Sequence, residues 1–389
     1  MSELSFTAAD DSLWQQYDDL ATRAYGHRIS DITALREHAD LRVATRDGRV
    51  VAGGLGLLVN QNFGGSPVPS ACLAAGCVAP EERGEHLAAR TTTERLRPLQ
   101  EKGAVISAIS TSSTGYARRL GWEAPVPVFA WAVTTDDLKQ SFTYDGHQIT
   151  HGATPDAHTL QRHLAQLWNG PIERPTWWFP WKQSKSNLTT YCFHKPGHPT
   201  TGTLSFTTRR HERHGVTLIV HEFWAADEST TAAMLAFLGR HNTRAKTIEF
   251  RRGALPPHPT LLHSLHHHRT TAEAWHPWML RILDLPQAIR LRGWPADLTA
   301  TIPVQIENDN GGSADRYILQ IAAGAAEIHP THIEGTVTLT RRQLAVWYAG
   351  GYRTTTSARM GGVRATSHKA LATLIGTTTD LEPWLPDHF

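Results

Sequence analysis

The order of helical and strand-like segments limits the fold of this chain more than any other feature of its sequence. In the first third, helical segments such as DSLWQQYDDLATRAYG alternate with apolar strand segments such as ACLAAGCVAP. A second, loosely similar alternation runs from about residue 157 to residue 250, and from about residue 295 three strands precede two helices. We therefore predict an α/β (α+β) chain with two related mixed-sheet domains and a different, α+β third domain.

Length and charge set the broad class of protein. The 389 residues suit two or three domains, which we place at residues 1–140, 141–294 and 295–389. Lys and Arg number 38 against 36 Asp and Glu, so the charge does not favour nucleic-acid binding. The longest apolar stretch, VAGGLGLLV, is far shorter than the ~20 residues of a membrane helix. We expect no membrane association and a cytoplasmic location.

Cysteine and histidine are not spaced as a metal or redox site requires. The three cysteines, Cys72, Cys77 and Cys192, are too few for a disulfide framework and lack the paired spacing of metal ligands. The histidines of HSLHHHR have a spacing that could hold a metal, but a solvated turn also accounts for them. We predict no metal cofactor.

One strand–turn–helix segment, CLAAGCVAPEERGEHLAARTTTERL, carries the clearest chemical signal. An apolar strand ends in V-A-P, and a short turn that carries an arginine opens a helix. Such a turn directs several unpaired backbone N–H groups and the positive end of the helix at one point. The sequence therefore predicts an anion site here, although an ordinary turn with a surface arginine has the same pattern.

The same segment resembles the pyrophosphate loop of the GNAT superfamily of acyl-CoA N-acyltransferases, which has the pattern R-x-x-G-x-G/A. The matching residues are Arg83, Gly84, Glu85, His86, Leu87 and Ala88, and His86 stands where the family usually has glycine. Three further segments, AVISAISTSSTGYARRLGW, WMLRILDLPQAIRLRGW and LTRRQLAVWYAGGYRTTTSARMGGV, together with the terminal D-x-F, extend the resemblance over nearly the whole chain. They resemble the enhanced intracellular survival (Eis) family.

This resemblance implies two fused GNAT domains, of which only the first binds CoA, and a sterol-carrier-like third domain. It implies acetyl-CoA or another acyl-CoA as donor, with the pantetheine arm running beside Cys77, Val78 and Ala79. It also implies a tyrosine acid on the helix after the fifth strand. Tyr116 is the candidate, although it lies one residue from the position that the family's spacing indicates, and a packing role is the alternative. The family's hexamers imply a homo-oligomer.

The last ten residues, DLEPWLPDHF, have the composition of a docked segment. Trp384, Leu385 and Phe389 would each gain about 2 kcal/mol on full burial. In the resembled family the terminal carboxylate is the general base, which assigns that role to Phe389. Such a base helps because an alkylamine has a pKa near about 10.4 and is almost entirely protonated at neutral pH.

Several candidate residues could line the pocket for the amine acceptor. They are Tyr25, His27, Trp177, Trp178, Trp181 and His388, although packing between domains is the alternative for the tryptophans. The acceptor is then an aminoglycoside-like polyamine or, because His388 is not an acid, a less cationic intermediate of secondary metabolism. Two further alternatives stay open: an acyl carrier protein as donor, and a catalytically silent binding or scaffold protein.

Overall fold

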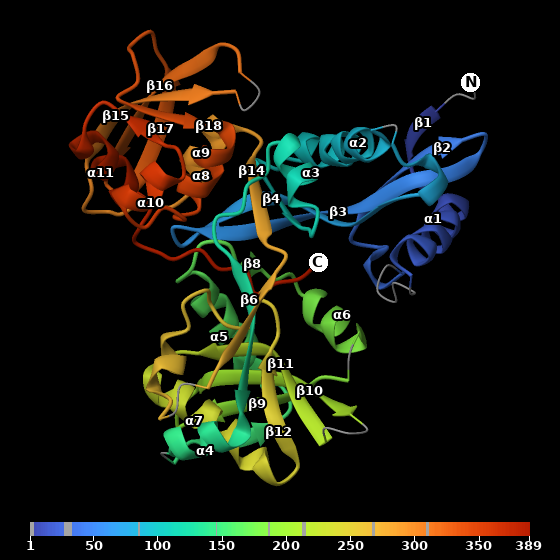
Figure 1. The fold of residues 1–389 in the computed structure, drawn as a ribbon, viewed down its shortest axis with the longest axis vertical. Helices are drawn as coiled ribbons and strands as arrows, with labels where there is room; N and C mark the ends of the chain where they lie inside the picture. Colours follow the sequence, from blue (N-terminus) through green and yellow to red (C-terminus); the bar gives the residue numbers. More distant parts are fainter. Residues whose placement is uncertain are drawn as a thin grey trace.

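The computed structural model describes residues 4–26, 33–84, 86–144, 146–185, 187–211, 215–266, 269–308 and 311–389. These residues form three mixed β-sheets with helices packed on them (Figure 1). The helices are α1 (Asp11–Tyr25), α2 (Leu87–Glu101), α3 (Thr114–Arg119), α4 (Thr135–Ser141), α5 (Pro155–Ala165), α6 (Trp178–Lys185), α7 (Glu228–Gly239), α8 (Leu285–Leu291), α9 (Arg341–Tyr348), α10 (Thr355–Met360) and α11 (His368–Gly376).

The strands belong to the three sheets as follows. The first sheet contains β1 (Leu4–Ala8), β2 (Asp40–Arg46), β3 (Arg49–Phe63), β4 (Ser66–Val78), β5 (Ile106–Ser110) and β14 (Trp278–Ile282), in this order, with β8 (Ile172–Glu173) paired to β3. The second contains, in spatial order, β13 (Thr271–Trp275), β6 (Val128–Thr134), β12 (Ala245–Phe250), β11 (Gly215–Ala225), β10 (Thr200–His211), β9 (Thr189–His194) and β7 (Gln148–His151). The third contains β17 (Ala325–Pro330), β16 (Ala314–Ala322), β15 (Ala300–Glu307), β18 (Val337–Thr340) and β19 (Arg364–Ala365).

The glycines of β3 explain how two helices pack on the first sheet. A Cβ on Gly53 would lie 2.8 Å from the ring of Tyr17 on α1, whereas a Cβ on Gly54 would lie 2.4 Å from the guanidinium carbon of Arg95 on α2. Successive residues of a strand point to opposite faces, so α1 and α2 cover opposite faces of this sheet. Figure 1 shows them on either side of β3.

Two strands cross between the sheets. Strand β6, which follows the last helix of the first sheet, pairs with β12 of the second sheet. Strand β14 lies in WMLRILDLPQAIRLRGW, one of the segments that carry the resemblance to the Eis family, and it pairs with β5 from Trp278↔Ser110 to Ile282↔Ile106. Sheet membership therefore differs from the linear division at residues 140 and 294, because each of these two sheets contains a strand from the neighbouring part of the chain: β14 at the edge of the first sheet, and β6 between β13 and β12 in the second.

The third domain shares a hydrophobic core with the first. Phe63, at the tip of the β3–β4 hairpin, contacts Tyr348 of α9 with 5.1 Å between ring centroids. The backbone of the same tip approaches Gly293 so closely that a Cβ on Gly64 would lie 1.9 Å from the Gly293 carbonyl oxygen. The α/β prediction with two mixed-sheet domains and an α+β third domain is confirmed. Of the described helices, none is both long and apolar enough to cross a membrane.

Candidate functional site

Strands β4 and β5 separate in the first domain, which opens a strand edge. They pair in parallel from Ser70↔Ile106 to Leu73↔Ile109, and β4 then continues alone to Val78. The pairing of β4 with β3 shifts register between Gly53 and Leu55, which marks a β-bulge at Ala75 and Gly76. Beyond Leu73, β4 therefore has one edge without a strand partner in the described part of the chain.

The bulge is held by side chains from both faces of the sheet. Ala75 has a φ of +48°, a left-handed conformation that costs a residue other than glycine about 1 kcal/mol or more. The Tyr17 hydroxyl donates to the Ala75 carbonyl, and the Tyr25 hydroxyl donates to the Gly76 carbonyl at 2.8 Å. From the α2 face, Arg95 Nη2 donates to the Ala74 carbonyl. Strained backbone with this much support is typical of a functional site.

Burial keeps the ionisable groups beside the bulge in their neutral forms. It raises the pKa of Tyr25 to about 12 and that of Cys77 to about 12, in each case as the largest cause. It also raises the pKa of Tyr17 well above the ordinary value. These hydroxyl and thiol groups therefore remain protonated at neutral pH, and the two tyrosine hydroxyls position the β4 backbone.

The predicted anion loop lies between β4 and α2. His86 caps α2 with a φ of +55° and a ψ of +16°, so it adopts the left-handed conformation that glycine favours. Arg83 and Gly84 are exposed, Leu87 is buried, and Ala88 is partly buried. Glu85 lies outside the described residues.

Charge in this loop is distributed so that Arg83 stays available. Glu82 pairs with Arg46 at 3.0 Å, and Glu81 lies 3.5 Å from Arg49. Arg83 has no ion-pair partner among the residues that the structure describes. An exposed arginine beside the start of a 15-residue helix is a suitable anion site.

Tyr116 lies on α3 against the first turns of α2. Its hydroxyl donates to the Ala88 carbonyl at 2.9 Å and lies 2.7 Å from the Thr92 hydroxyl. Burial raises the pKa of Tyr116, while the hydrogen bond with Thr92 and the charge of Arg95 oppose that rise. The phenol is therefore protonated at neutral pH, as a proton donor must be.

The C-terminal segment, residues 381–389, runs between the first and second sheets and ends near the centre of the molecule (Figure 1). Asn169 donates its N–H to the Glu382 carbonyl at 2.9 Å and accepts from the Trp384 N–H at 2.8 Å. The Trp384 indole donates to the Gly253 carbonyl at 2.7 Å. The Asn169 side chain also accepts from the Gly64 N–H at 2.7 Å, which connects this segment to the first sheet.

A buried ion pair fixes the segment near its end. Asp387 accepts from the Ile172 N–H and from Arg174 Nε, both at 2.8 Å. Arg174 also pairs with Glu222 at 3.0 Å. Burial opposes the charge of Arg174, but the two carboxylates outweigh it and raise its pKa. Removing one member of this triad would leave a buried charge without compensation.

His388 lies among cations, and Phe389 packs on apolar residues. The ring Nε2 of His388 lies 2.7 Å from the Arg252 carbonyl, and the His388 carbonyl accepts from Lys182 Nζ. Burial, followed by the charges of Arg252 and Lys182, lowers the pKa of His388 well below its ordinary range. Phe389 is partly buried and packs on the core cluster that also contains Cys77.

The tryptophans proposed for the acceptor pocket lie mainly in the core. Trp178 has 0% and Trp181 has 4% of its surface exposed, and the two rings meet edge to face at 4.9 Å. Trp177 is partly buried and stacks on His38 with 4.4 Å between centroids. The packing alternative therefore fits Trp178 and Trp181, whereas Trp177 and the 43%-exposed Tyr25 remain accessible. His27 lies outside the described residues.

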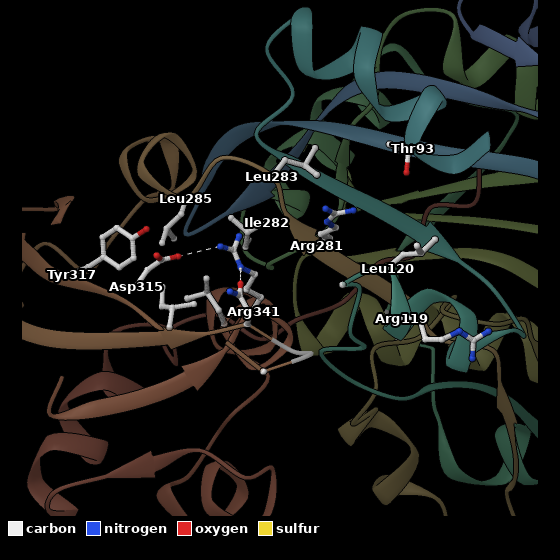
Figure 2. A pocket seen from close by; sticks show the side chains of 15 residues that line it. Thr93, Arg119, Leu120, Arg281, Ile282, Leu283, Leu285, Asp315, Tyr317 and Arg341 are labelled. Atoms are coloured by element: carbon white, nitrogen blue, oxygen red, sulfur yellow. Dashed lines mark hydrogen bonds and ion pairs between the residues drawn. The ribbon is translucent and has the colours of Figure 1, made fainter. Parts of the chain in front are cut away.

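A cavity of about 590 Å³ lies between the first and third domains (Figure 2). Arg119, Arg281 and Arg341 give it a basic lining. Arg341 is already bound to Asp315 at 3.1 Å, and Arg281 lies over the Trp122 ring at 5.0 Å. None of the described residues that line this cavity belongs to β4, so we do not place the reaction there.

Sequence comparison identifies the three domains. Residues 5–124 and residues 170–282 match two families that are both described as acetyltransferase (GNAT) domains, and residues 285–386 match the sterol carrier protein domain. The chain belongs to the GNAT acetyltransferases. It is a tandem GNAT N-acyltransferase with a sterol-carrier-like C-terminal domain, as the resemblance to the Eis family predicted.

Solved structures of similar fold cover the whole chain of this tandem GNAT protein. A GCN5-related N-acetyltransferase from Anabaena variabilis is 23% identical, with 100% of each chain covered and a TM-score of 0.87. A GCN5-related N-acetyltransferase from Kribbella flavida is 21% identical over 100% of this chain and 99% of its own, with a TM-score of 0.81. Eis1 from Mycobacterium abscessus is 17% identical, with 100% of each chain covered and a TM-score of 0.79. Among curated protein sequences, none matches this chain significantly.

Sequence reasoning missed some functional candidates of this GNAT protein. Arg95 lies in a polar helical stretch, and the space that it fills is indicated only by the glycines of VAGGLGLL and AAGC. Arg174 precedes a proline in the same stretch as the tryptophans that were predicted to line the acceptor pocket, and no role was predicted for it. For Arg95 the sequence did contain a signal, because several glycines within two neighbouring strands indicate that another element approaches them closely.

Proposed function

We propose that this enzyme transfers an acyl group, acetyl by default, from a CoA thioester directly to an amine of a small molecule. The observation that carries the proposal is the separation of β4 from β5 beyond Leu73, which leaves a strand edge beside the loop that precedes α2. A pantetheine arm is an extended amide chain and can pair with such an edge as an added strand does. The donor would lie along residues 77–79, with its pyrophosphate against residues 83–88.

The reaction then needs a base and an acid on opposite sides of the thioester. The carboxylate of Phe389 takes the ammonium proton, and the amine lone pair attacks the thioester carbonyl carbon. The carbon–sulfur bond breaks, the sulfur keeps the electron pair, and Tyr116 protonates the thiolate. The nitrogen loses its second proton to solvent as the amide forms, and solvent returns a proton to the Tyr116 phenolate. The raised pKa of Tyr116 supports this role because the phenol carries its proton at neutral pH.

The charges around the C-terminal segment support an acceptor with few positive charges. Burial is the largest cause of the lowered pKa of His388, and the charges of Arg252, Lys182 and Arg251 lower it further. A polyamine would bring several like charges into this partly desolvated region, which costs free energy. We therefore favour a monoamine, such as an intermediate of secondary metabolism, over an aminoglycoside-like polyamine.

Thioester turnover with a panel of amines tests the proposal. Acetyl-CoA and longer acyl-CoAs are incubated with monoamines and polyamines, and free thiol is followed with a thiol reagent. We expect thiol release that depends on a monoamine and a mass increase of one acyl group on that amine. If amine-dependent transfer occurs only from an acylated carrier protein, that carrier protein and not CoA is the donor. Failure with both donors would favour a silent binding or scaffold protein.

His86 is the observation that keeps the carrier-protein donor as a second candidate. Its imidazole is exposed at the loop position where the GNAT pattern has glycine. A carrier protein presents phosphopantetheine through one phosphodiester, whereas CoA has a pyrophosphate and a nucleotide. A side chain that narrows the loop would hinder the carrier-bound donor less.

A further inference from the structure

A buried arginine without a carboxylate partner lies behind the bulge of β4. Arg95 has 5% of its surface exposed, and burial lowers its pKa as the largest cause. Its Nη2 donates to the carbonyls of Leu55 and Ala74, while its Nε is buried without a hydrogen-bond partner. Among the described residues no carboxylate pairs with it.

The surrounding strands are shaped to hold this side chain. A Cβ on Gly54 would lie 2.4 Å from the Arg95 guanidinium carbon, and a Cβ on Gly76 would lie 2.7 Å from its Nη1. Two glycines on two neighbouring strands therefore make room for one guanidinium. A buried, unpaired cation costs several kcal/mol, so a site built for it indicates that an anion approaches it during function.

The neighbours of Arg95 identify where that anion would form. The groups whose ionised forms would interact with its charge are Tyr17, Tyr116, Tyr25 and Cys77, from α1, α3 and β4. All four have raised pKa values, with burial as the largest cause, and stay neutral at neutral pH. The compensating anion is therefore not one of these side chains in the resting protein.

We propose that Arg95 forms a thiolate-binding site, in which its guanidinium stabilises the sulfur anion that leaves the acyl donor. This inference rests on the proposed function, because the thioester must lie between the β4 bulge and Tyr116. When the amine nitrogen bonds to the carbonyl carbon, the carbon–sulfur bond breaks and its electron pair stays on sulfur. Arg95 stabilises that charge until the proton of Tyr116 reaches it.

Titration of bound CoA tests this site without knowledge of the amine. The thiolate absorbs in the ultraviolet, and the difference between complexes with CoA and with desulfo-CoA isolates its signal. A free alkyl thiol has a pKa of about 8.5, and we expect the pKa of the thiol of bound CoA to be lower by at least about one unit. Cys72 and Cys77, whose pKa values burial raises to about 12, would not contribute below about pH 10.

Three variants separate the charge of Arg95 from its packing. Arg95→Met should return the pKa of the thiol of bound CoA to about 8.5 or higher. Arg95→Lys keeps a positive charge and should retain part of the downward pKa shift. Arg292→Met is the matched control, since Arg292 is also buried, with an unpartnered Nη2, but lies against Tyr348 and Trp294. It should leave the bound thiol unchanged. Melting curves and desulfo-CoA affinity show whether each variant is folded and still binds.

The outcomes distinguish this inference from the proposed function. CoA that binds to the wild-type protein with an unshifted thiol would overturn the thiolate site and leave the donor proposal intact. The same holds if Arg95→Met, which removes the charge, binds CoA and keeps the full wild-type shift. Failure of both CoA and desulfo-CoA to bind the wild-type protein would overturn the use of CoA itself.

Discussion

Single residues in left-handed backbone mark the site of this protein more clearly than its charges do. Ala75 at the bulge of β4 and His86 at the start of α2 both have positive φ values, of +48° and +55°. They lie at the two ends of the segment proposed to hold pantetheine and pyrophosphate. At each point the backbone has a shape that an extended or helical residue could not provide.

His86→Gly tests whether the imidazole narrows the anion loop. Glycine adopts this backbone without strain, so we expect stability to rise by about 0.5–1 kcal/mol and acyl-CoA to bind several-fold more tightly. Asp47→Gly is the matched control, because Asp47 has a φ of +51° in the β2–β3 turn. It should change melting temperature but not CoA affinity. Unchanged affinity in His86→Gly would remove the steric argument for a carrier-bound donor.

Tyr116→Phe tests whether Tyr116 is the general acid that protonates the leaving thiolate. The change removes the hydroxyl that contacts Ala88 and Thr92, and we expect kcat to fall between about tenfold and ten-thousandfold. Tyr144→Phe, in the second domain, is the control and should retain full kcat. Steady-state rates under conditions where chemistry limits turnover give the measurement. Wild-type kcat in Tyr116→Phe would exclude this tyrosine from proton transfer.

At the scale of elements, the C-terminal segment contacts several separate parts of the fold. Trp384 lies between Trp168 and Trp224, with ring centroids 5.1 Å and 4.8 Å away. Three residues after Trp384, Asp387 is held by its ion pair with Arg174. The segment therefore has a fixed path, and the position of its last residue is set by packing in two domains.

Adding one or two glycines after Phe389 tests whether its terminal carboxylate is the general base. Each glycine moves the carboxylate by about 3.5 Å but leaves every native side chain in place. We expect an unchanged melting curve and a fall in kcat of at least about a hundredfold. A glycine inserted after Gly197, in the exposed β9–β10 turn, is the control and should keep full activity. Full activity in the extended protein would mean that the terminus only packs.

Strand β11 gives the stability of the second domain a pH dependence. His221 on this strand hydrogen-bonds with Thr207 at 2.9 Å, and burial, followed by Arg251, lowers its pKa to about 4. The unfolded chain, with a histidine pKa near about 6.5, then binds more protons than the folded one. Stability should therefore fall as pH drops from about 6.5 to about 4.

Melting temperatures across this pH range provide the measurement. His221→Gln cannot titrate and should lose less stability than the wild-type protein between about pH 7 and pH 5. His198→Gln, at an exposed turn, is the control and should follow the wild-type curve. An identical pH dependence in His221→Gln and wild type would contradict the assignment to this side chain.

The elements themselves were largely predictable from the sequence, whereas their partners were not. The D-G pair at residues 47 and 48 and the periodic segment around Trp14 are local signals, and β2, β3 and α1 form where they indicate. The pairing of β14 with β5 depends on residues more than 160 positions apart, which no local pattern encodes. The glycines of β3 and β4 indicate that some element approaches closely, but they do not identify Arg95 of α2, because its place depends on the bulge in β4.

At the scale of the whole molecule, the exchanged strands make the first two domains dependent on each other. The first sheet ends with β14 from the end of the second domain, and the second sheet contains β6 from the end of the first. A fragment of residues 1–140 would expose the apolar edge of β5 and carry β6 without its sheet.

Calorimetry tests this dependence. We expect one unfolding transition for the first two domains, with equal calorimetric and van't Hoff enthalpies, and an aggregated or unfolded fragment 1–140. A fragment of residues 1–284, which contains both exchanged strands, is the matched comparison and should be more soluble than 1–140. Two separate transitions assigned to the first two domains would contradict this coupling.

The exchanged strand also sets an order of events on the ribosome. Strand β5 is complete at Ser110, but its partner β14 is complete only at Ile282. At typical rates of synthesis, about 170 residues take roughly 9 to 35 s, and during that time the edge of β5 has no partner from its own chain. The nascent first domain is thus open to pairing with neighbouring nascent chains. Slow translation of the second domain would lengthen that exposure, whereas a chaperone that binds strand edges would protect it.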